Sequence, residues 1–354
     1  MGSVIVGTGI AVPDEVVTNA DLEALMDTSD EWITSRTGVR ERRVAPDGVA
    51  TSHLAAEAGT RALADAGVTA ADVDLLVVAT MTPDFYAPGS APLVQDRMGL
   101  GAIPAFGLRQ QCSGFVYGLD LADAYLSSGR ASTAVVIGAE VHAGIQPWSE
   151  DLRRHRDGSP IDPDSYARTT SYRDWGVLFG DGAGAVVLRA GASEGSGLLT
   201  THLATDGSLF ELIHVPALGS ADRPFVDARR VAADEHMPTM QGPMLYRQAV
   251  RLMPAAVEAV LEGAGLDLTD VDVVVAHQAN ERIVDGVRKR LGVSADVVPT
   301  NLDRYGNTTA GTLPILYHEL RTDGRVFPGA LVCFVAFGAG AHWGAALYRE
   351  PADG

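Results

Sequence analysis

Apolar and polar positions along the chain predict short buried strands that alternate with helices. Apolar runs at residues 4–13, 72–79 and 330–334 are typical of strands buried in a sheet. The Ala-rich stretch at residues 51–67 has helical spacing and ends at a glycine, as many helices do. Residues 18–22 carry the cap residues of another helix start. Alternation of this kind indicates the α/β fold class.

Parts of the first half of the chain recur in the second half. The texts Ala-Gly and Asp-Val-Asp within residues 66–74 recur, at one constant offset, within residues 264–272. The Gly-rich segment at residues 178–188, predicted to be a hairpin, has an echo at residues 335–345. Two matched segments in the same order indicate an internal duplication of a helix–strand unit. An active site between two such halves would draw residues from both.

The duplication predicts an N-terminal half at residues 1–192 and a C-terminal half at residues 193–354. Two polar stretches without clear periodicity interrupt this pattern, at residues 146–171 and 206–240. Irregular segments of this length inside a compact domain are often lids or partner loops. We therefore expect both stretches to serve a functional site.

Composition and charge narrow the class of protein. The 354 residues, 46% of them hydrophobic, suffice for one large core or two closely packed ones. No apolar run reaches the roughly 20 residues of a membrane span and no export signal is recognisable, so we expect a cytoplasmic protein with no membrane partner. A formal net charge of −18 argues against nucleic acid as a partner. Cys112 and Cys333 lie far apart, and no Cys or His spacing has the paired form of a zinc site, so we expect no disulfide and no metal.

One cysteine stands where a predicted strand turns into a predicted helix. An extended apolar run at residues 103–108 leads to Cys112, and a helical pattern that begins at Phe115 follows it. At such a junction free backbone N–H groups and the positive end of the helix dipole favour a thiolate, the form that a nucleophile needs. The alternative interpretation of Cys112 is a small buried hydrophobic residue.

Two polar residues of the second half stand at similar junctions. His277 directly follows the repeated strand, at the end of the strand where α/β sheets usually place their chemistry. Asn307 stands at the start of another predicted helix. Each has a structural interpretation of its own, a hydrogen-bonded core histidine or a capping asparagine. Together with Cys112 they form a credible catalytic set.

The motifs around these residues resemble the β-ketoacyl-acyl-carrier-protein synthase III family of the thiolase superfamily. The matching motifs, in order, are DEWITSRTG at residues 30–38, CSGF at 112–115, FGDGAGA at 179–185, HQANERI at 277–283 and GNT at 306–308. The resemblance implies a thiolase-like fold, in which two duplicated halves form layered αβαβα, and a homodimer. A fold of two duplicated halves agrees with the internal repeat described above.

The resemblance also implies an activity and a catalytic mechanism. The chain would condense an acyl group from acyl-CoA with malonyl-carrier protein, or with malonyl-CoA, with loss of CO₂. Cys112 would carry the acyl group, and the backbone N–H groups of Cys112 and Ala339 would form the oxyanion hole. A neutral His277 and Asn307 would donate hydrogen bonds to the thioester oxygen of the malonyl group. The CoA thioester is a substrate, so no cofactor is expected.

Further residues are matched to the two substrates by motif. The predicted CoA contacts are Trp32 and Arg173, which match the pair that sandwiches the adenine, Arg36 at the pyrophosphate and Asn280 at the pantetheine arm. Carrier proteins are acidic, and the predicted basic patch that would dock one consists of Arg247, Arg282, Lys289 and Arg290. A solvated helix face is the alternative interpretation of the charges at residues 288–290.

Departures from the family pattern favour a specialised member, in polyketide or related biosynthesis, over a fatty acid enzyme. Ala87 stands where relatives carry a bulkier residue that lines the acyl pocket across the dimer, which suggests a longer or branched acyl group beside Phe337. The stretch at residues 146–171 is longer than in the housekeeping enzymes. The main rival is an acyltransferase that passes the acyl group from Cys112 to a hydroxyl or amine, but Asn307 is a poor base for that reaction.

Overall fold

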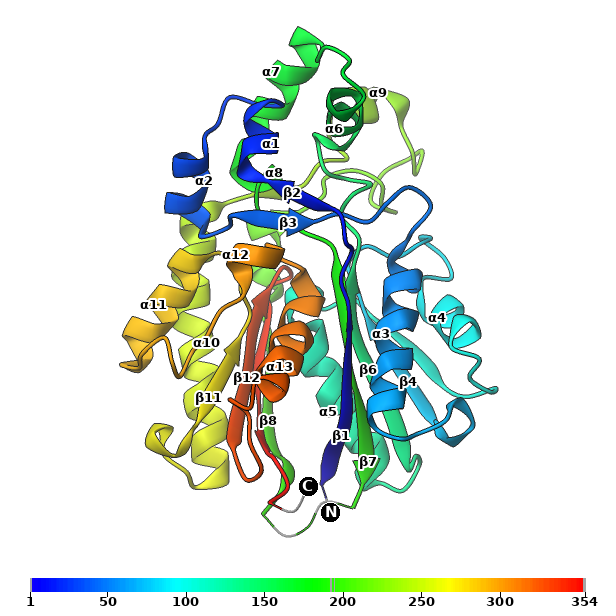
Figure 1. Cartoon of the computed structure of the whole chain (residues 1–354), viewed down its shortest axis with the longest axis vertical. Coiled ribbons are helices and arrows are strands. Elements are labelled where there is room, and N and C mark those ends of the chain that lie inside the picture. Colours follow the sequence, from blue (N-terminus) through cyan, green and yellow to red (C-terminus); the bar gives the residue numbers. More distant parts are fainter. Residues whose placement is uncertain (1, 192, 194, 353–354) are drawn as a thin grey trace.

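Five layers of helices and sheets build the computed structural model of the chain, which describes residues 2–191, 193 and 195–352 (Figure 1). Two helices lie between two sheets, and two more cover the outer face of each sheet. From one outer layer to the other these helices are α3 (Thr51–Asp65) with α4 (Ala91–Arg97), α5 (Gly114–Ser127) with α13 (Thr312–Thr322), and α10 (Gly242–Ala264) with α11 (Glu281–Leu291). The predicted αβαβα layering is confirmed.

The two sheets have matching strand orders. The N-terminal sheet contains β1 (Ser3–Ala11), β4 (Leu75–Ala79), β5 (Ala105–Leu108), β6 (Thr133–Glu140) and β7 (Gly182–Ala190). The C-terminal sheet contains β8 (Gly197–Thr205), β11 (Val273–Ala276), β12 (Leu331–Gly338) and β13 (His342–Arg349). The first has the order β1-β7-β6-β4-β5, and the second, read from β8, has the order β8-β13-β12-β11. In both sheets the strands at one end pair in parallel, β6 with β4 and β4 with β5 in the first and β12 with β11 in the second. The remaining neighbours in each sheet pair antiparallel.

The repeated Asp-Val-Asp text has the same structural role in both halves. Its last aspartate directly precedes β4 in one half and β11 in the other. The Asp74 carboxylate accepts hydrogen bonds from the backbone N–H groups of Ser132, at 2.7 Å, and Thr133, at 3.1 Å. The Asp272 carboxylate likewise accepts one from Leu331 N–H, at 2.8 Å. Each aspartate therefore ties the start of a parallel strand to its neighbour, which explains why the text recurs.

The predicted boundary between the halves touches residue 192, which lies outside the described residues, and it stays a prediction. The predicted hairpin at residues 178–188 is wrong in detail. Those residues form a turn that leads into the single strand β7, which pairs with β6, whereas residues 335–345 do contain a hairpin, between β12 and β13. Glycine-rich text marks a close backbone approach in both places, but only one of them reverses the chain.

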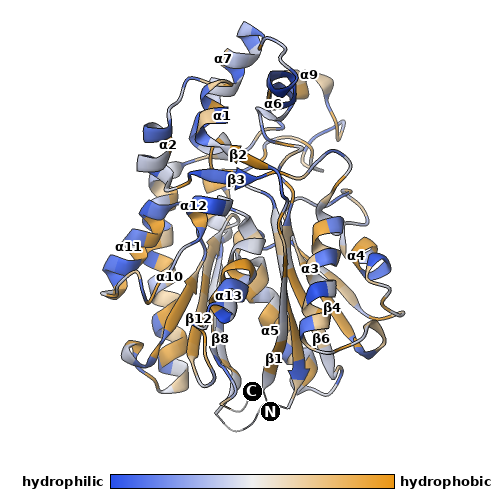
Figure 2. Cartoon of the chain, in the orientation of Figure 1, coloured by the Kyte–Doolittle hydropathy of each residue, from blue (hydrophilic) through white to orange (hydrophobic). Residues whose placement is uncertain are grey.

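The two polar stretches are more regular than predicted. Residues 146–171 contain α6 (Ser149–Arg156) and α7 (Pro163–Ser171), and residues 206–240 contain the short elements η3 (Gly207–Leu212), β9 (Ile213–His214), α9 (Ala228–Ala232) and β10 (Thr239–Met240). Their helices are short, and α6 and α7 consist mostly of polar residues, so the apolar spacing that reveals a helix is weak in them. Figure 2 shows α6 and α7 as largely hydrophilic, at the end of the molecule where α1 and α2 also lie.

A cap over one end of the layers is built from β2 (Val16–Thr18), α1 (Asn19–Glu23), α2 (Asp30–Thr37) and β3 (Glu41–Arg43). The Thr18 side chain accepts from Asp21 N–H and the Asp21 carboxylate accepts from Thr18 N–H, so the predicted helix start is a capping box. Arg42 anchors the cap: its guanidinium is fully buried and donates to the carbonyls of Val17, at 3.1 Å, and Val177, at 2.8 Å. Burial lowers the pKa of Arg42 to about 9.

Apolar side chains fill each space between layers. A central cluster around α5 and α13 includes Phe115, Tyr317 and Phe334, and two outer clusters join α3 to the first sheet and α10 and α11 to the second. Cys333 belongs to the outer C-terminal cluster, as expected of a core residue. Over the described residues, the structure has no helix with the length and apolar character that a bilayer crossing requires.

The two halves meet where a turn of the second half rests on a strand of the first. The turn η5 (Thr309–Gly311) crosses β6 at Gly138, where a Cβ atom would lie 2.0 Å from the carbonyl oxygen of Ala310. Only glycine permits this approach, because both partners are backbone.

A Gly138→Ala substitution should therefore force η5 away from β6. We expect it to lower the free energy of unfolding by about 3 kcal/mol or more, the upper end of the cost of overpacking. Urea unfolding followed by circular dichroism measures the change. The matched control is Gly107→Ala in β5, where the nearest atom to an added Cβ is the Ala91 Cβ at 3.9 Å, and a change below about 0.5 kcal/mol is expected. Equal effects of the two substitutions would contradict the role of Gly138.

Candidate active site

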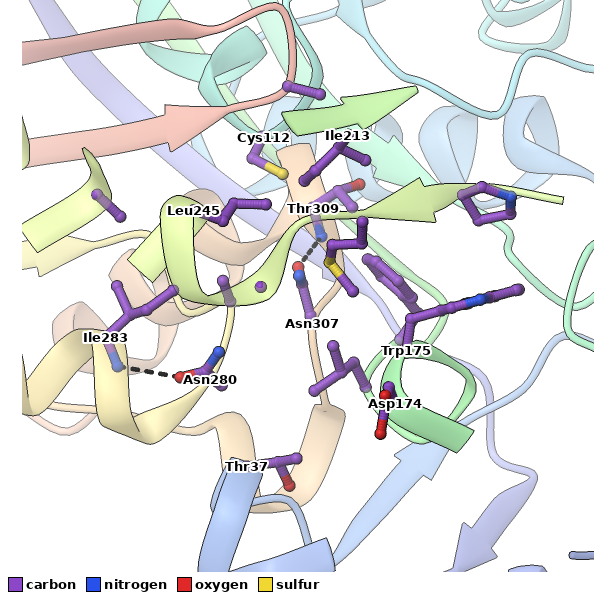
Figure 3. Close-up of a pocket in the computed structure, with 18 of the residues that line it drawn as sticks. Thr37, Cys112, Asp174, Trp175, Ile213, Leu245, Asn280, Ile283, Asn307 and Thr309 are labelled. Carbon is purple, nitrogen blue, oxygen red and sulfur yellow. Dashed lines mark hydrogen bonds between the residues drawn. The ribbon is translucent and has the colours of Figure 1, made fainter. Parts of the chain in front are cut away.

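The three predicted catalytic residues line one cavity of about 530 Å³ between the cap and the sheets. Cys112 reaches it from the N-terminal half, and His277 and Asn307 reach it from the C-terminal half. Figure 3 shows Cys112 and Asn307 pointing into the same space. The fold therefore brings together three residues that the sequence places far apart, as expected of a site between duplicated halves.

Cys112 lies in the turn η2 (Gln111–Ser113), between β5 and α5. The turn is held in a strained conformation, because Gln111 has a φ of 52° without being glycine. Ser113 Oγ donates to the carbonyl of His342, at 2.9 Å, which ties the turn to β13. Gly338 lets the turn approach β12, since a Cβ there would lie 2.9 Å from the Cys112 nitrogen. The predicted strand-to-helix junction is present.

The resting state of Cys112 differs from the expected thiolate. Burial raises the pKa of the thiol to about 12, and the negative charge of Glu140 adds to the effect, against a smaller opposing hydrogen bond from the backbone. The prediction from the helix start alone is wrong here, because it considered the dipole and left out desolvation. Cys112 is a thiol at neutral pH, and its negative charge has to develop during a reaction.

His277 ends β11 and is 2% exposed. Its backbone N–H donates to the Val335 carbonyl at 2.8 Å, which continues the pairing of β11 with β12. Within the described residues neither ring nitrogen has a hydrogen-bond partner. Burial lowers the pKa of His277 to about 3, so its imidazole is neutral. A neutral imidazole has one N–H to donate, which is the form that the resemblance requires.

Asn307 is held on both sides by backbone. Its own N–H donates to the Leu178 carbonyl at 2.8 Å, and its carbonyl accepts from Gly180 N–H at 3.2 Å. The side-chain Oδ1 accepts from Thr309 N–H at 2.8 Å, drawn as a dashed line in Figure 3. Because the amide oxygen is engaged, the Nδ2 group is left to donate to a ligand.

The position predicted for an oxyanion hole has the required backbone groups. Ala339 lies in the turn between β12 and β13 and lines the cavity together with Cys112. In the part of the chain that the structure describes, neither backbone N–H donates to a backbone carbonyl. Both can therefore donate to an oxygen atom, and their assignment as an oxyanion hole stays a prediction.

The predicted CoA contacts gather at the mouth of the cavity. Trp32 and Arg36 on α2 line it, as does Asn280, whose Oδ1 caps α11 by accepting from Ile283 N–H at 3.0 Å. The guanidinium carbon of Arg36 lies 4.5 Å from the centroid of the Trp32 ring. That of Arg173, at the start of α8 (Arg173–Gly176), lies 5.0 Å from it.

The space in which an adenine is predicted to stack between Trp32 and Arg173 is closed in this structure. The guanidinium of Arg173 itself covers the indole and donates to the Asp27 carbonyl at 2.6 Å. A base stacked between two planar groups needs roughly 7 Å, twice an ordinary contact distance. Arg173 would have to move before an adenine could enter there.

The predicted basic patch lies on two neighbouring helices beside the mouth. Arg247 on α10 and Arg282, Lys289 and Arg290 on α11 are all exposed. Arg282 also lines the cavity. Arg288, in contrast, is paired with Glu281 at 2.6 Å and Asp285 at 2.8 Å, so its charge is compensated.

The two residues predicted for the acyl pocket differ in their position relative to the cavity. Phe337 is buried and lines the cavity. Ala87 is exposed and is not among the residues that line the cavity of its own chain, so its predicted place in the pocket of a dimer partner stays a prediction.

The cavity is also lined by Met81, His142 and Thr309, for which the motifs predicted no role. His142 follows β6 just as His277 follows β11. The rule that the carboxyl ends of parallel strands carry the chemistry could therefore have found it.

Comparison with known sequences agrees with the motifs. Residues 261–350 match the family described as 3-oxoacyl-[acyl-carrier-protein (ACP)] synthase III C terminal, and residues 106–156 and 161–207 match 3-oxoacyl-[acyl-carrier-protein (ACP)] synthase III. The β-ketoacyl-[acyl-carrier-protein] synthase III of Paramagnetospirillum magneticum is 42% identical over 98% of both chains. That of Symbiobacterium thermophilum is 42% identical over 98% of this chain and 97% of the relative.

Solved structures with the same fold include a 3-oxoacyl-[acyl-carrier-protein] synthase III and a priming ketosynthase of a polyketide pathway. The 3-oxoacyl-[acyl-carrier-protein] synthase III of Aquifex aeolicus has a TM-score of 0.82 and 37% identity, over 98% of this chain and 100% of that one. The priming β-ketosynthase of the R1128 polyketide pathway has a TM-score of 0.83 and 30% identity, over 99% and 96% of the two chains. The chain thus has the thiolase-like fold, and it belongs to the β-ketoacyl-[acyl-carrier-protein] synthase III family of condensing enzymes.

Proposed function

We propose that this chain condenses an acyl-CoA primer with a malonyl thioester, with loss of CO₂, through an acyl group carried by Cys112. The observation that best supports this proposal is that one buried cavity holds a thiol together with two neutral hydrogen-bond donors, His277 and Asn307. Neutral donors suit a reaction whose negative charge develops on an oxygen atom of the substrate.

The first half-reaction transfers the acyl group. Cys112 Sγ attacks the thioester carbonyl of acyl-CoA, and the developing oxyanion accepts hydrogen bonds from the N–H groups of Cys112 and Ala339. As the new C–S bond forms, the bond to the CoA sulfur breaks. The proton lost by the Cys112 thiol ends on the departing CoA sulfur, so one thiol is exchanged for another. The start of α5 behind Cys112 stabilises negative charge on Sγ while it develops.

The second half-reaction forms the carbon–carbon bond. The thioester oxygen of the malonyl group accepts hydrogen bonds from His277 and from Asn307 Nδ2, which stabilise the enolate left when CO₂ departs. The enolate carbon attacks the acyl carbonyl on Cys112, the C–S bond breaks, and Cys112 takes up a proton to become a thiol again. The basic patch beside the mouth, Arg247, Arg282, Lys289 and Arg290, would dock an acidic carrier protein.

Transfer of the acyl group to a hydroxyl or amine is the alternative. That reaction needs a base to deprotonate the acceptor. Among the described residues that line the cavity, Asp174 is the one carboxylate, and it is exposed on α8 at the mouth. The absence of a carboxylate beside His277 in that lining favours condensation. We also propose that the chain acts as a homodimer in the cytoplasm, and that Ala87 and the two helices within residues 146–171 suit it to a primer of polyketide or specialised biosynthesis.

Exposure to acyl-CoA should add one acyl group to the chain, and the Cys112→Ala variant should gain none. Intact-protein mass spectrometry measures the adduct. Malonyl-carrier protein should then discharge it as a β-ketoacyl product. An adduct that persists with malonyl-carrier protein and malonyl-CoA alike would contradict condensation and point to a hydroxyl or amine acceptor.

Removing either donor should impair decarboxylation more than acyl transfer. In His277→Ala and in Asn307→Ala we expect the rate of CO₂ release from labelled malonyl-carrier protein to fall by about 10²- to 10³-fold, the usual cost of one such donor. Formation of the Cys112 adduct should change by less than about 10-fold. His202→Ala, which removes an exposed histidine of β8, is the control and should match the unmodified chain. Equal losses in both half-reactions would contradict this division of roles.

A neutral, buried His277 should make the protein less stable in mild acid. The pKa of His277 is about 3 in the folded state against 6.5 for the ordinary side chain. Between these values the unfolded chain binds the extra proton, so stability is lost as the pH falls. From pH 7 to pH 5 the unmodified chain should lose about 2 kcal/mol relative to His277→Asn, measured by urea unfolding at both pH values. A parallel decline of the two proteins would show that His277 titrates normally.

A further inference from the structure

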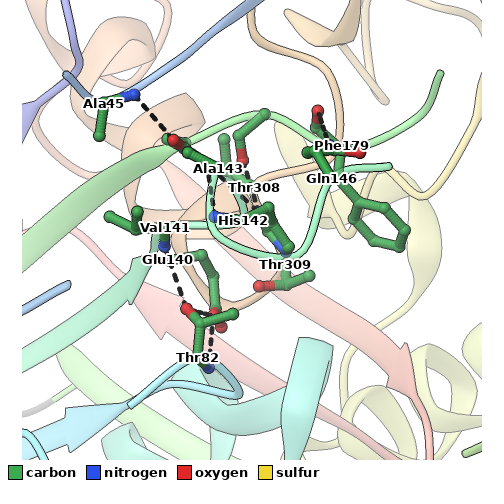
Figure 4. Close-up of polar contacts among 12 residues, drawn as sticks. Ala45, Thr82, Glu140, Val141, His142, Ala143, Gln146, Phe179, Thr308 and Thr309 are labelled. Carbon is green, nitrogen blue, oxygen red and sulfur yellow. Dashed lines mark hydrogen bonds and ion pairs between the residues drawn. The ribbon is translucent and has the colours of Figure 1, made fainter. Parts of the chain in front are cut away.

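His142 is a buried titratable residue of the cavity that the proposed mechanism does not use. It follows β6 and is 1% exposed. Its backbone N–H donates to Asp181 Oδ1 at 2.6 Å, and its ring stacks on Phe179 with the centroids 4.8 Å apart. Ring atom Nδ1 lies 2.9 Å from the carbonyl oxygen of Gly180. Because a carbonyl oxygen can only accept, Nδ1 carries a proton and donates it (Figure 4).

The other ring nitrogen of His142 lacks a partner. In the described part of the chain, Nε2 is buried without a hydrogen bond, and so is the hydroxyl of Thr309 in the lining of the same cavity. Thr309 lies in η5, which rests on β6 at Gly138, and Figure 4 shows it close to His142. Each buried polar atom left unpaired costs about 1–3 kcal/mol. Two such atoms in one cavity indicate that a ligand supplies the missing partners.

The strand order places His142 on the same side of the cavity as Cys112. Met81, His142 and Cys112 follow β4, β6 and β5, and β4 is the middle strand of these three parallel neighbours. The positions after β5 and β6 are therefore two strand spacings apart, roughly 10 Å. An acyl chain that extends from Cys112 toward the His142 imidazole would therefore span a gap of only a few atoms.

The cavity has a solvent-exposed end and a buried end. Arg36 and Arg282 at the mouth are exposed, whereas Cys112, His142 and Thr309 are buried. A CoA thioester that enters from the mouth must bring its acyl group to Cys112 first. The acyl group then lies at the buried end, against the side of the sheet that carries His142.

The charges around His142 favour a neutral ligand atom. Burial by itself lowers the pKa of His142, but the Asp181 carboxylate, whose Oδ1 lies 3.7 Å from ring atom Nδ1, and the charge of Glu140 outweigh it, so the pKa is raised above its ordinary value. Glu140 is also buried and accepts from the N–H groups of Met81 and Thr82. Two carboxylates thus already face one imidazole. A third negative charge at this place would be repelled, while a hydroxyl or carbonyl oxygen would not.

We propose that His142 and Thr309 form a polar recognition site for the acyl group, so that the chain selects primers with a neutral oxygen substituent over apolar primers of the same shape. A hydroxyl a few atoms from the thioester would pair with His142 Nε2 and with the Thr309 hydroxyl. Met81 and Phe337 in the same lining would pack against the carbon atoms of the primer. This inference rests on the proposed function, because it concerns the acyl group that Cys112 accepts.

The test compares 3-hydroxybutyryl-CoA with 3-methylbutyryl-CoA, which differ by a hydroxyl in place of a methyl group. The rate of Cys112 acylation at matched concentrations is followed by intact-protein mass spectrometry, with both enantiomers of the hydroxyacyl compound. We expect the unmodified chain to favour the better hydroxyacyl enantiomer by about 10-fold or more, because a site with unpaired polar groups discriminates against an apolar ligand. In His142→Leu the preference should reverse.

Two further variants protect this test against misfolding. Thr309→Val keeps the shape of the side chain and removes its hydroxyl, and it should reduce the preference for the hydroxyacyl primer. His142→Gln keeps a hydrogen-bonding group and should retain part of the preference. Because each preference is a ratio of two rates in one variant, a lower amount of folded protein cancels.

Three outcomes would overturn the inference. The first is equal or faster acylation of the unmodified chain by 3-methylbutyryl-CoA. The second is a preference that survives both His142→Leu and Thr309→Val. The third is faster acylation by succinyl-CoA than by 3-hydroxybutyryl-CoA, because the succinyl group carries a negative charge. If no acyl-CoA modifies Cys112, the proposed function itself fails, and that result is distinct from acylation without preference.

Discussion

The two halves are joined by a reciprocal contact between a helix start of one half and a strand of the other. The turn at residues 309–311 rests on Gly138 of β6, and the turn around Cys112 rests on Gly338 of β12. Both contacts need glycine, because the backbone of the turn occupies the space of a side chain. Since Cys112 lies in one of these turns and Asn307 stands two residues before the other, the packing that joins the halves also sets the positions of these two residues.

Duplication gave both halves the same strand ends, which now have different uses. Beyond β4, Thr80 Oγ1 donates to the buried carboxylate of Glu140 at 3.1 Å, in a network that also includes Thr82. Beyond β11, the ring nitrogens of His277 have no hydrogen-bond partner among the described residues, and the residue lines the cavity. A polar group that is fully paired stabilises the fold, whereas one that is left unpaired is available to a substrate at a cost in stability. In the proposed mechanism the N-terminal half therefore supplies the nucleophile and its support, and the C-terminal half supplies the side-chain donors.

Burial shifts the pKa values of Cys112 and His277 in opposite directions, yet it leaves both groups uncharged. It raises the pKa of Cys112 to about 12 and lowers that of His277 to about 3, so both groups are neutral at rest. The two polar stretches lie at the same end of the molecule as the cap (Figure 1). Arg168 of α7 donates two hydrogen bonds to Asp234, each at 2.8 Å, which link the stretch at residues 146–171 to the one at residues 206–240. The two polar stretches are thus one continuous cover and not independent loops.

The sequence alone determined the features that depend on local patterns. Buried strands, the α3 helix, the duplicated text and the motifs around Cys112, His277 and Asn307 can all be read from short stretches, because periodicity and turn residues act locally. Tertiary structure decided what depends on neighbours distant in the chain. The polar helices α6 and α7 carry too little apolar spacing to be recognised, and the protonation of Cys112 follows from desolvation. The place of His142 in the same cavity as Cys112 follows from the order of β6, β4 and β5. Burial and strand order arise only when segments far apart in sequence pack together, so no local pattern could contain them.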